Sequence, residues 1–159
     1  MEKPEVLFDR WFVQPLNKLE AIPNGDGGFI ALATSCFLYE RFAVATINKS
    51  GGEADRPRKI EKFMEDFNTD RGTAEAFWSV VRDGILHQGM PKQKERGTKK
   101  LPGYILHYSF PDPVKLSDWG KESALLIQPW KFMNRVIELW QDNLELLEQN
   151  LSFPWAKIF

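Results

Sequence analysis

The sequence predicts an all-α protein, an up-and-down bundle of four to five helices with a small β-hairpin-like insertion near residues 101–119. Apolar side chains recur every three or four residues over several long segments, which is the spacing of helices that bury one face. One aromatic, β-prone stretch interrupts this pattern before the last helix. With 159 residues, 43% hydrophobic and 27% charged, the chain fits a single helical domain over 1–159.

Four helices are expected in the first part of the chain. A short amphipathic helix is predicted over residues 5–18, although Pro15 should end or distort it because proline removes a backbone donor and crowds the preceding turn. A broad apolar stripe predicts a strong helix over 29–48. The same spacing predicts helices over 58–68 and 74–87.

The predicted ends of these segments follow from single residues. Thr73 can cap the helix that ends at His87, and Gly89 and Pro91 prevent its continuation. The last helix is expected over 129–151, where two adjacent apolar stripes predict burial on two sides and a rod of roughly 34 Å.

The insertion is predicted from the run Leu101–Phe110, which is aromatic and β-prone, followed by the turn residues Pro111-Asp112-Pro113. Val114-Lys115-Leu116 then alternates apolar and charged side chains. We expect a hairpin here, with His107 as a structural or surface histidine.

The charge, the cysteine content and the missing motifs of the chain limit the classes of function that we expect. The net charge of −1 does not favour nonspecific nucleic-acid binding, so any such contact must come from a local patch. The single Cys36 excludes an internal disulfide and favours a reducing compartment. No signal or membrane-spanning apolar run is expected, which predicts a cytoplasmic protein without membrane contact. Because phosphate loops, serine elbows and metal-ligand clusters are missing from the sequence, we expect no metal and no cofactor.

The segment from Arg82 to His87 combines a proton carrier with a phosphate binder at a helix end. Five positions along an ideal helix turn the two side chains about 140° apart. They can therefore meet only at a helix end or across a two-fold axis between two copies of the chain. Gly84 favours close approach of another backbone. The simpler alternative is that both residues stabilise the negative end of the helix dipole.

These residue types suit RNA cleavage. RNA carries its own nucleophile, the 2′-hydroxyl, so the reaction needs a base, an acid and positive charge on the phosphate. His87 can serve as the base or the acid, and Arg82 can stabilise the phosphate charge through forked hydrogen bonds. None of these roles requires a metal.

The run Val81-Arg82-Asp83-Gly84-Ile85-Leu86-His87-Gln88-Gly89-Met90 resembles the signature of HEPN domains, the "higher eukaryotes and prokaryotes nucleotide-binding" superfamily. The resemblance implies a dimerising helical bundle and a metal-independent endoribonuclease of the toxin or defence type. It implies Arg82 and His87 as the active pair, with Asp83 in the polar position beside the arginine. An antitoxin or other regulatory protein is then a candidate partner.

The resemblance leaves alternatives open. HEPN toxins that are paired with a nucleotidyltransferase antitoxin often carry a modified tyrosine two positions after the histidine, and Gly89 stands there instead. Because several HEPN branches keep the fold and lose the activity, a non-catalytic dimer that binds a nucleotide or a protein is the alternative function.

Two further features can support the site. Glu40 interrupts the apolar stripe of 29–48, so it either reaches solvent at the edge of the stripe or faces the same cavity as the Arg/His segment. A basic run follows the segment and can dock an RNA backbone, or it can be a solvated loop. Its candidate RNA-binding residues are Lys92, Lys94, Arg96, Lys99 and Lys100.

Overall fold

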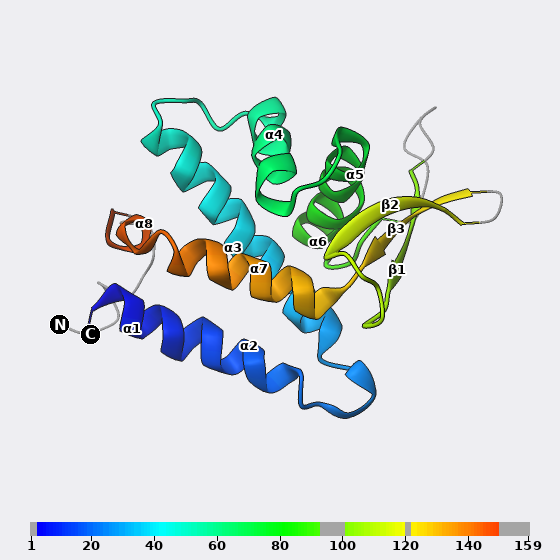
Figure 1. Ribbon diagram of the computed structural model, residues 1–159, viewed down its shortest axis with the longest axis horizontal. Helices are drawn as coiled ribbons and strands as arrows, with labels where there is room; N and C mark the ends of the chain where they lie inside the picture. Colours follow the sequence, from blue (N-terminus) through cyan, green and yellow to red (C-terminus); the bar gives the residue numbers. More distant parts are fainter. Residues whose placement is uncertain (1–2, 93–100, 120–121, 150–159) are drawn as a thin grey trace.

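The computed structural model describes residues 3–92, 101–119 and 122–149, which form a mainly helical protein with a small sheet at one end (Figure 1). The helical elements are α1 (Pro4–Phe8), η1 (Asp9–Val13), α2 (Gln14–Leu19), η2 (Pro23–Gly25), α3 (Gly28–Lys49), α4 (Arg56–Phe67), α5 (Arg71–Ala76), η3 (Phe77–Arg82), α6 (Asp83–Gln88), α7 (Pro129–Gln141) and α8 (Leu144–Gln149). The strands are β1 (Gly103–Leu106), β2 (Val114–Trp119) and β3 (Glu122–Ile127).

Helix α3 is the centre of the fold, and its observed bounds agree with the predicted 29–48. It packs chiefly against α7, with α2 and α4 beside it (Figure 1). Within the described residues α3 is long and apolar enough to cross a membrane, and half of that stretch is buried in the protein. The expectation that the chain has no such apolar run is thus corrected, and the packing of α3 accounts for its composition.

The first helical rod runs without interruption from α1 through η1 to α2. Its middle part, η1, is a π-helix in which the Gln14 N–H donates to the Asp9 carbonyl five residues earlier. The widened turn directly precedes Pro15, so this proline distorts the helix and does not end it.

The sheet is larger than the predicted insertion. Its strand order is β1-β3-β2, with β1 parallel to β3 and β2 antiparallel to β3. The hairpin is therefore formed by β2 and β3, and the prediction of a hairpin confined to 101–119 was wrong. Strand β3 was missed because its short apolar run, Ala124 to Ile127, has no alternation that separates a central strand from a helix.

A side-chain cap joins the sheet to the helix that carries the Arg/His segment. Asp70 caps α5 by accepting from the Thr73 N–H at 2.9 Å and from the Thr73 hydroxyl at 2.8 Å. The hydroxyl of Thr73 accepts in turn from the backbone N–H of Leu116 in β2 at 3.0 Å. The N-cap is thus Asp70 and not Thr73 as predicted, because Thr73 is needed between helix and strand.

The single helix predicted over 129–151 is divided within the described residues. Helix α7 ends at Gln141, a turn follows at Asp142 and Asn143, and α8 begins at Leu144. The Asn143 side chain donates to the Leu139 carbonyl at 2.9 Å, which satisfies an acceptor at the helix end. Helix α8 then packs on α1, which a straight continuation of α7 does not do.

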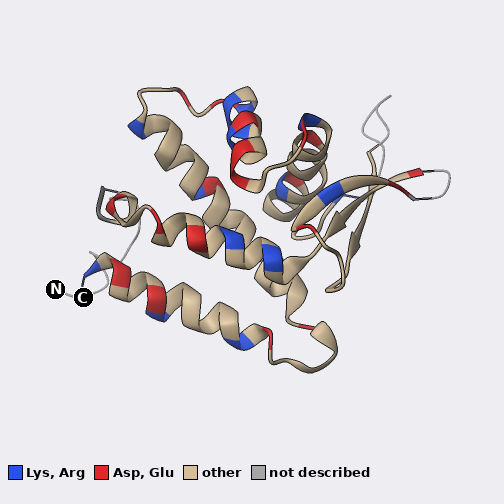
Figure 2. Ribbon diagram, in the orientation of Figure 1, with Lys and Arg blue, Asp and Glu red and all other residues tan. Residues whose placement is uncertain are grey.

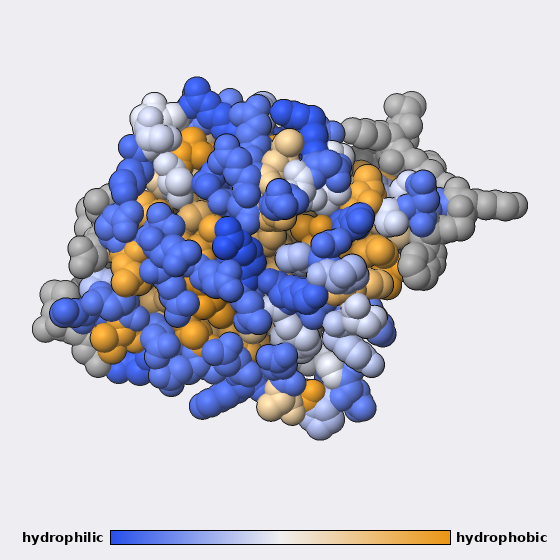
Figure 3. Space-filling view, in the orientation of Figure 1, coloured by the Kyte–Doolittle hydropathy of each residue, from blue (hydrophilic) through white to orange (hydrophobic). Residues whose placement is uncertain are grey.

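Aromatic side chains fill the core between α3, α4, η3 and α7. Phe67 and Phe132 stack with ring centroids 4.8 Å apart, and Phe63 stacks on Phe77 at 4.5 Å. The heavy aromatic content is therefore mostly internal. Hydrophilic residues cover most of the face seen in Figure 3, with apolar residues in small patches between them. The axes of α4 and α5 run at a steep angle to the axis of α7 (Figure 1).

Candidate functional site

The Arg/His segment lies near the end of one continuous helix made of α5, η3 and α6. The central part, η3, is a π-helix, and the N–H of Asp83 donates to the Trp78 carbonyl five residues earlier. The helix ends at Gly89, whose φ of 72° is left-handed, as the sequence predicts. A π-helical turn within an α-helix is common at functional sites.

Arg82 is held by two carboxylates. Its Nε donates to Oε2 of Glu40 at 2.6 Å, its Nη2 donates to the other oxygen of Glu40, and its Nη1 donates to Oδ1 of Asp83 at 2.8 Å. The guanidinium carbon lies 5.4 Å from the centre of the Trp78 ring. Glu40 is thus paired with Arg82 and is only 16% exposed, while no cavity that it shares with His87 is seen in the described residues.

Two further cations from α4 complete the group. Lys59 donates to Glu40 at 3.2 Å. Arg56 donates through Nη1 to Oδ2 of Asp83 and through Nη2 to the hydroxyl of Ser79, both at 3.0 Å. We call Glu40, Arg56, Lys59, Arg82 and Asp83 the Arg82 cluster. Its three cations and two carboxylates leave one excess positive charge, and Figure 2 shows both signs of charge interleaved on α4.

Pairing favours the charged forms of Glu40, Asp83 and Arg82. Burial alone would raise the pKa of Glu40, but hydrogen bonds and charge from Arg82 and Lys59 outweigh it and lower the pKa. The pKa of Asp83 is lowered in the same way, against burial, by Arg82 and Arg56. The hydrogen bond to Glu40 raises the pKa of Arg82.

His87 differs from Arg82 in its surroundings. It is exposed in the last turn of α6, and it makes no hydrogen bond to the described residues. It follows Asp83 by four positions and therefore shares a helix face with that carboxylate. Arg82 lies about 140° away from it around an ideal helix.

Gly84 is approached by the protein's own backbone. A Cβ at this position would lie 2.5 Å from the Met90 carbonyl oxygen and 2.6 Å from the Lys92 nitrogen. The Lys92 N–H also donates to the Val80 carbonyl at 2.8 Å, which ties the chain after the helix back onto it. The small residue at 84 is thus explained within one chain and gives no support to a dimer.

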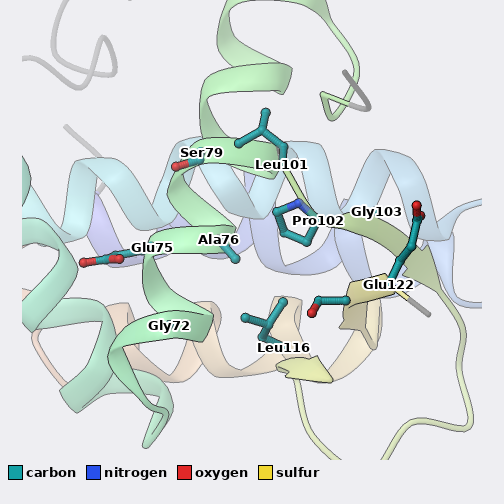
Figure 4. Close-up of a pocket in the computed structure, with 10 residues that line it drawn as sticks. Gly72, Glu75, Ala76, Ser79, Leu101, Pro102, Gly103, Leu116 and Glu122 are labelled. Atoms are coloured by element: carbon teal, nitrogen blue, oxygen red, sulfur yellow. The ribbon is translucent and has the colours of Figure 1, made fainter. Parts of the chain in front are cut away.

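A cavity of about 490 Å³ lies between the α5–η3 helix and the sheet (Figure 4). Its walls include Ala76, Leu101, Pro102 and Leu116, and neither Arg82 nor His87 lines it. The side chains of Glu75 and Ser79 point away from the strands in Figure 4. The cavity therefore does not include the two predicted active residues, although Ser79, which binds Arg56, is one of its lining residues.

The other residues singled out in the sequence are the basic run that begins at Lys92 and the second histidine, His107. Lys92 is partly buried, and Lys94, Arg96, Lys99 and Lys100 lie outside the described residues. His107 stacks on Tyr108 with centroids 4.5 Å apart, and its Nδ1 lies 2.7 Å from the Ser109 hydroxyl. In the described parts of the chain no three His, Cys, Asp or Glu side chains are grouped to hold a metal ion.

Sequence reasoning missed Arg56, Lys59 and Ser79. They contact residues 19 to 27 positions away, so only the packing of α4 against the other helices brings them together. A basic first turn on α4 was visible in the sequence, but nothing in it indicated which helix that turn would face. No family model matches the chain, and comparison with curated proteins and with solved structures found no match.

Proposed function

We propose that this protein is a metal-independent endoribonuclease of the HEPN type, with His87 as the proton-transferring residue and Arg82 supplying positive charge at the scissile phosphate. One observation carries the proposal. An exposed histidine without a hydrogen-bond partner in the described residues follows Asp83 by one helical turn, beside a charge cluster with excess positive charge.

The reaction is an intramolecular transesterification. The 2′-oxygen of the RNA forms a bond to phosphorus while the bond from phosphorus to the 5′-oxygen breaks. The 2′-hydroxyl proton leaves to a base, and a proton is delivered to the departing 5′-oxygen. His87 takes one of these two roles, and the products are a 2′,3′-cyclic phosphate and a 5′-hydroxyl.

Arg82 contributes through the arrangement of the Arg82 cluster. Three of its five N–H groups bind carboxylates, which fixes the guanidinium in one orientation over Trp78. A fixed cation needs no reorganisation as charge develops on the phosphate.

The same pairing favours a second candidate function. Glu40 and Asp83 already neutralise much of the Arg82 charge, which is the arrangement of an arginine that holds helices together. A non-catalytic HEPN-like dimer that binds a nucleotide or a protein partner is the alternative. It predicts no cleavage and no toxicity that depends on Arg82 or His87.

The test is cleavage of a fluorescently labelled RNA in the presence of EDTA by the wild type, His87→Ala and His107→Ala. We expect cleavage to fall at least a hundredfold in His87→Ala, because general acid–base catalysis contributes about 10²–10⁴-fold. His107→Ala is the matched control, since it removes the other histidine. Equal cleavage by wild type and His87→Ala excludes the assignment, and no cleavage by any of the three supports the non-catalytic alternative.

We also propose that the protein acts as a homodimer, in which two copies of the Arg/His segment line one cleft. Sedimentation of the purified protein measures the oligomeric state directly. A monomer at micromolar concentration contradicts the dimer but leaves the proton-transfer role of His87 intact. Co-purification with a protein that suppresses the cleavage would identify a regulator of the antitoxin type.

A further inference from the structure

One face of the η3–α6 helix carries Ser79, Asp83 and His87 at intervals of four residues. Asp83 and His87 lie in the regular α-helical part, so their Cβ atoms are about 5–6 Å apart. Ser79 and Asp83 lie on the same side because one guanidinium, that of Arg56, binds both of them. The three residues therefore form a short row that ends at the exposed histidine.

Arg56 is the cation that lies along this row. It is the first residue of α4, directly after the N-cap Asp55, and its side chain is 50% exposed. Two of its five N–H groups bind Ser79 and Asp83, and it makes no other hydrogen bond within the described residues. Its other donors have no partner among the described residues and lie on the half-exposed side of the guanidinium, where a ligand can reach them.

Arg82 does not have these properties. Its side chain is only 21% exposed, and its donors point to Glu40 and Asp83 at the interface with α3. Asp83 lies between the two arginines, with Oδ1 bound to Arg82 and Oδ2 bound to Arg56. The excess positive charge of the Arg82 cluster is thus most accessible at Arg56.

We propose that Arg56 directly binds the RNA phosphodiester next to His87, and that Arg82, besides the positive charge assigned to it above, orients Asp83 between the two arginines. The ligand class is a phosphodiester of single-stranded RNA, because a planar guanidinium with free donors matches phosphate oxygens. This inference rests on the proposed function. It removes the geometric difficulty that Arg82 and His87 do not share a helix face.

The chain provides a closely matched control residue, Arg71. It is the first residue of α5, directly after the N-cap Asp70, and its side chain is 53% exposed. It is paired with Glu61 and Glu75, just as Arg56 is paired with Asp83. Replacing either arginine with glutamine removes the same charge from equivalent helix positions.

The experiment measures binding of a 2′-O-methyl RNA oligonucleotide, which lacks the nucleophile and is not cleaved, by fluorescence anisotropy at several salt concentrations. We expect Arg56→Gln to weaken binding about tenfold and Arg71→Gln to leave it unchanged. The slope of log affinity against log salt should fall by about 0.7 in Arg56→Gln, as expected for one lost phosphate contact. Arg56→Lys should keep the salt slope and lose affinity, because the fork is missing.

The outcomes separate this inference from the proposed function. Weaker binding by Arg56→Gln together with no cleavage by wild type supports the phosphate site and contradicts the nuclease. His87-dependent cleavage with unchanged binding by Arg56→Gln supports the nuclease and overturns the role of Arg56. Equal weakening by Arg71→Gln, or no binding by the wild type, also overturns it. Circular dichroism of each variant checks that the fold is retained.

Discussion

Two neighbouring residues of α3, Tyr39 and Glu40, contact two different groups of charged side chains. Comparing the carboxylates of these two groups, Asp66 and Glu40, distinguishes a candidate charged site from a contact that only joins helices. Glu40 belongs to the Arg82 cluster. Tyr39 donates its hydroxyl to Asp66 at 3.0 Å, and Lys62 donates to the same carboxylate at 2.6 Å. The pKa of Glu40 is lowered, whereas burial raises the pKa of Asp66 despite Lys62 and Tyr39.

The difference follows from the geometry of the cationic partners. Glu40 receives a two-pronged guanidinium and a lysine, whereas the Asp66 carboxylate receives one lysine. Arg135 lies near Asp66 but donates to its backbone carbonyl at 2.8 Å. The Asp66 side chain is 5% exposed and that of Glu40 is 16% exposed. A well-paired carboxylate at the edge of the core thus supports a charged site, while a deeper one with fewer partners only joins helices.

The largest expected effect is a difference in stability between Glu40→Gln and Asp66→Asn. Glu40→Gln leaves Lys59 without its carboxylate partner and Arg82 with Asp83 alone, so it should lower the free energy of unfolding by about 3 kcal/mol at pH 7. Asp66→Asn keeps one acceptor and removes a carboxylate that is costly to ionise, so we expect a loss of about 1 kcal/mol. Urea denaturation measures both. An equal loss in the two variants would contradict the distinction.

The pH dependence of the same variants should show opposite trends. Because the folded pKa of Glu40 lies below its ordinary 4.5, its stabilisation is present above pH 4.5 and is lost as the pH falls through the folded pKa. The folded pKa of Asp66 lies above its ordinary 3.8, so its contribution is present below pH 3.8 and is lost as the pH rises through the folded value.

Between pH 7 and pH 3, therefore, the stability gap between wild type and Glu40→Gln should shrink, and the gap for Asp66→Asn should grow. Urea midpoints at half-unit pH steps measure both gaps. Parallel changes in the two gaps would show that the carboxylates titrate alike in the folded protein.

The smallest expected effect is that of Lys59→Met, which is best compared with the replacement of the other lysine of α4, Lys62. Lys59 and Lys62 are similarly exposed, at 17% and 20%, and each lies 5.7–5.9 Å from an aromatic ring. Lys62→Met removes the one cation on the Asp66 carboxylate and should cost about 1.5 kcal/mol. Lys59→Met leaves Glu40 with Arg82 and should cost about 0.5 kcal/mol. Thermal unfolding measures the loss of stability in both variants. A larger loss in Lys59→Met would contradict our conclusion that Glu40 is the better-paired carboxylate.

The sequence predicts those features of the protein that are determined by residues close together in the chain. The end of α6 could be predicted because Gly89 ends the helix through its own conformation. Glu40 could be singled out because a carboxylate on an apolar stripe requires a partner. The break after Gln141 could not, because the polar residues of the turn occupy positions that a continuous helix also leaves to solvent.

The partners in the site depend on tertiary packing. Arg56 and Asp83 are 27 residues apart, and the sequence pattern of α4 does not indicate which helix its first turn contacts. The parallel pairing of β1 with β3 is likewise non-local, since Leu106 pairs with Ile127. Periodicity describes one element at a time, and both features are properties of two elements together.

The π-helical segment η3 has a consequence for the evolution of this chain by insertion and deletion. Its hydrogen bonds span five residues, so it accommodates one residue more than an α-helix does. Deleting one residue between Trp78 and Asp83 would turn the hydrogen bond between them into the four-residue bond of a regular α-helix, so Asp83 and His87 would keep their side of the helix next to Arg56. Deleting one residue between Asp83 and His87, in the regular part of the helix, would instead rotate His87 by about 100° away from that side. The alignment of these side chains therefore tolerates a change of length in η3 and does not tolerate one in α6.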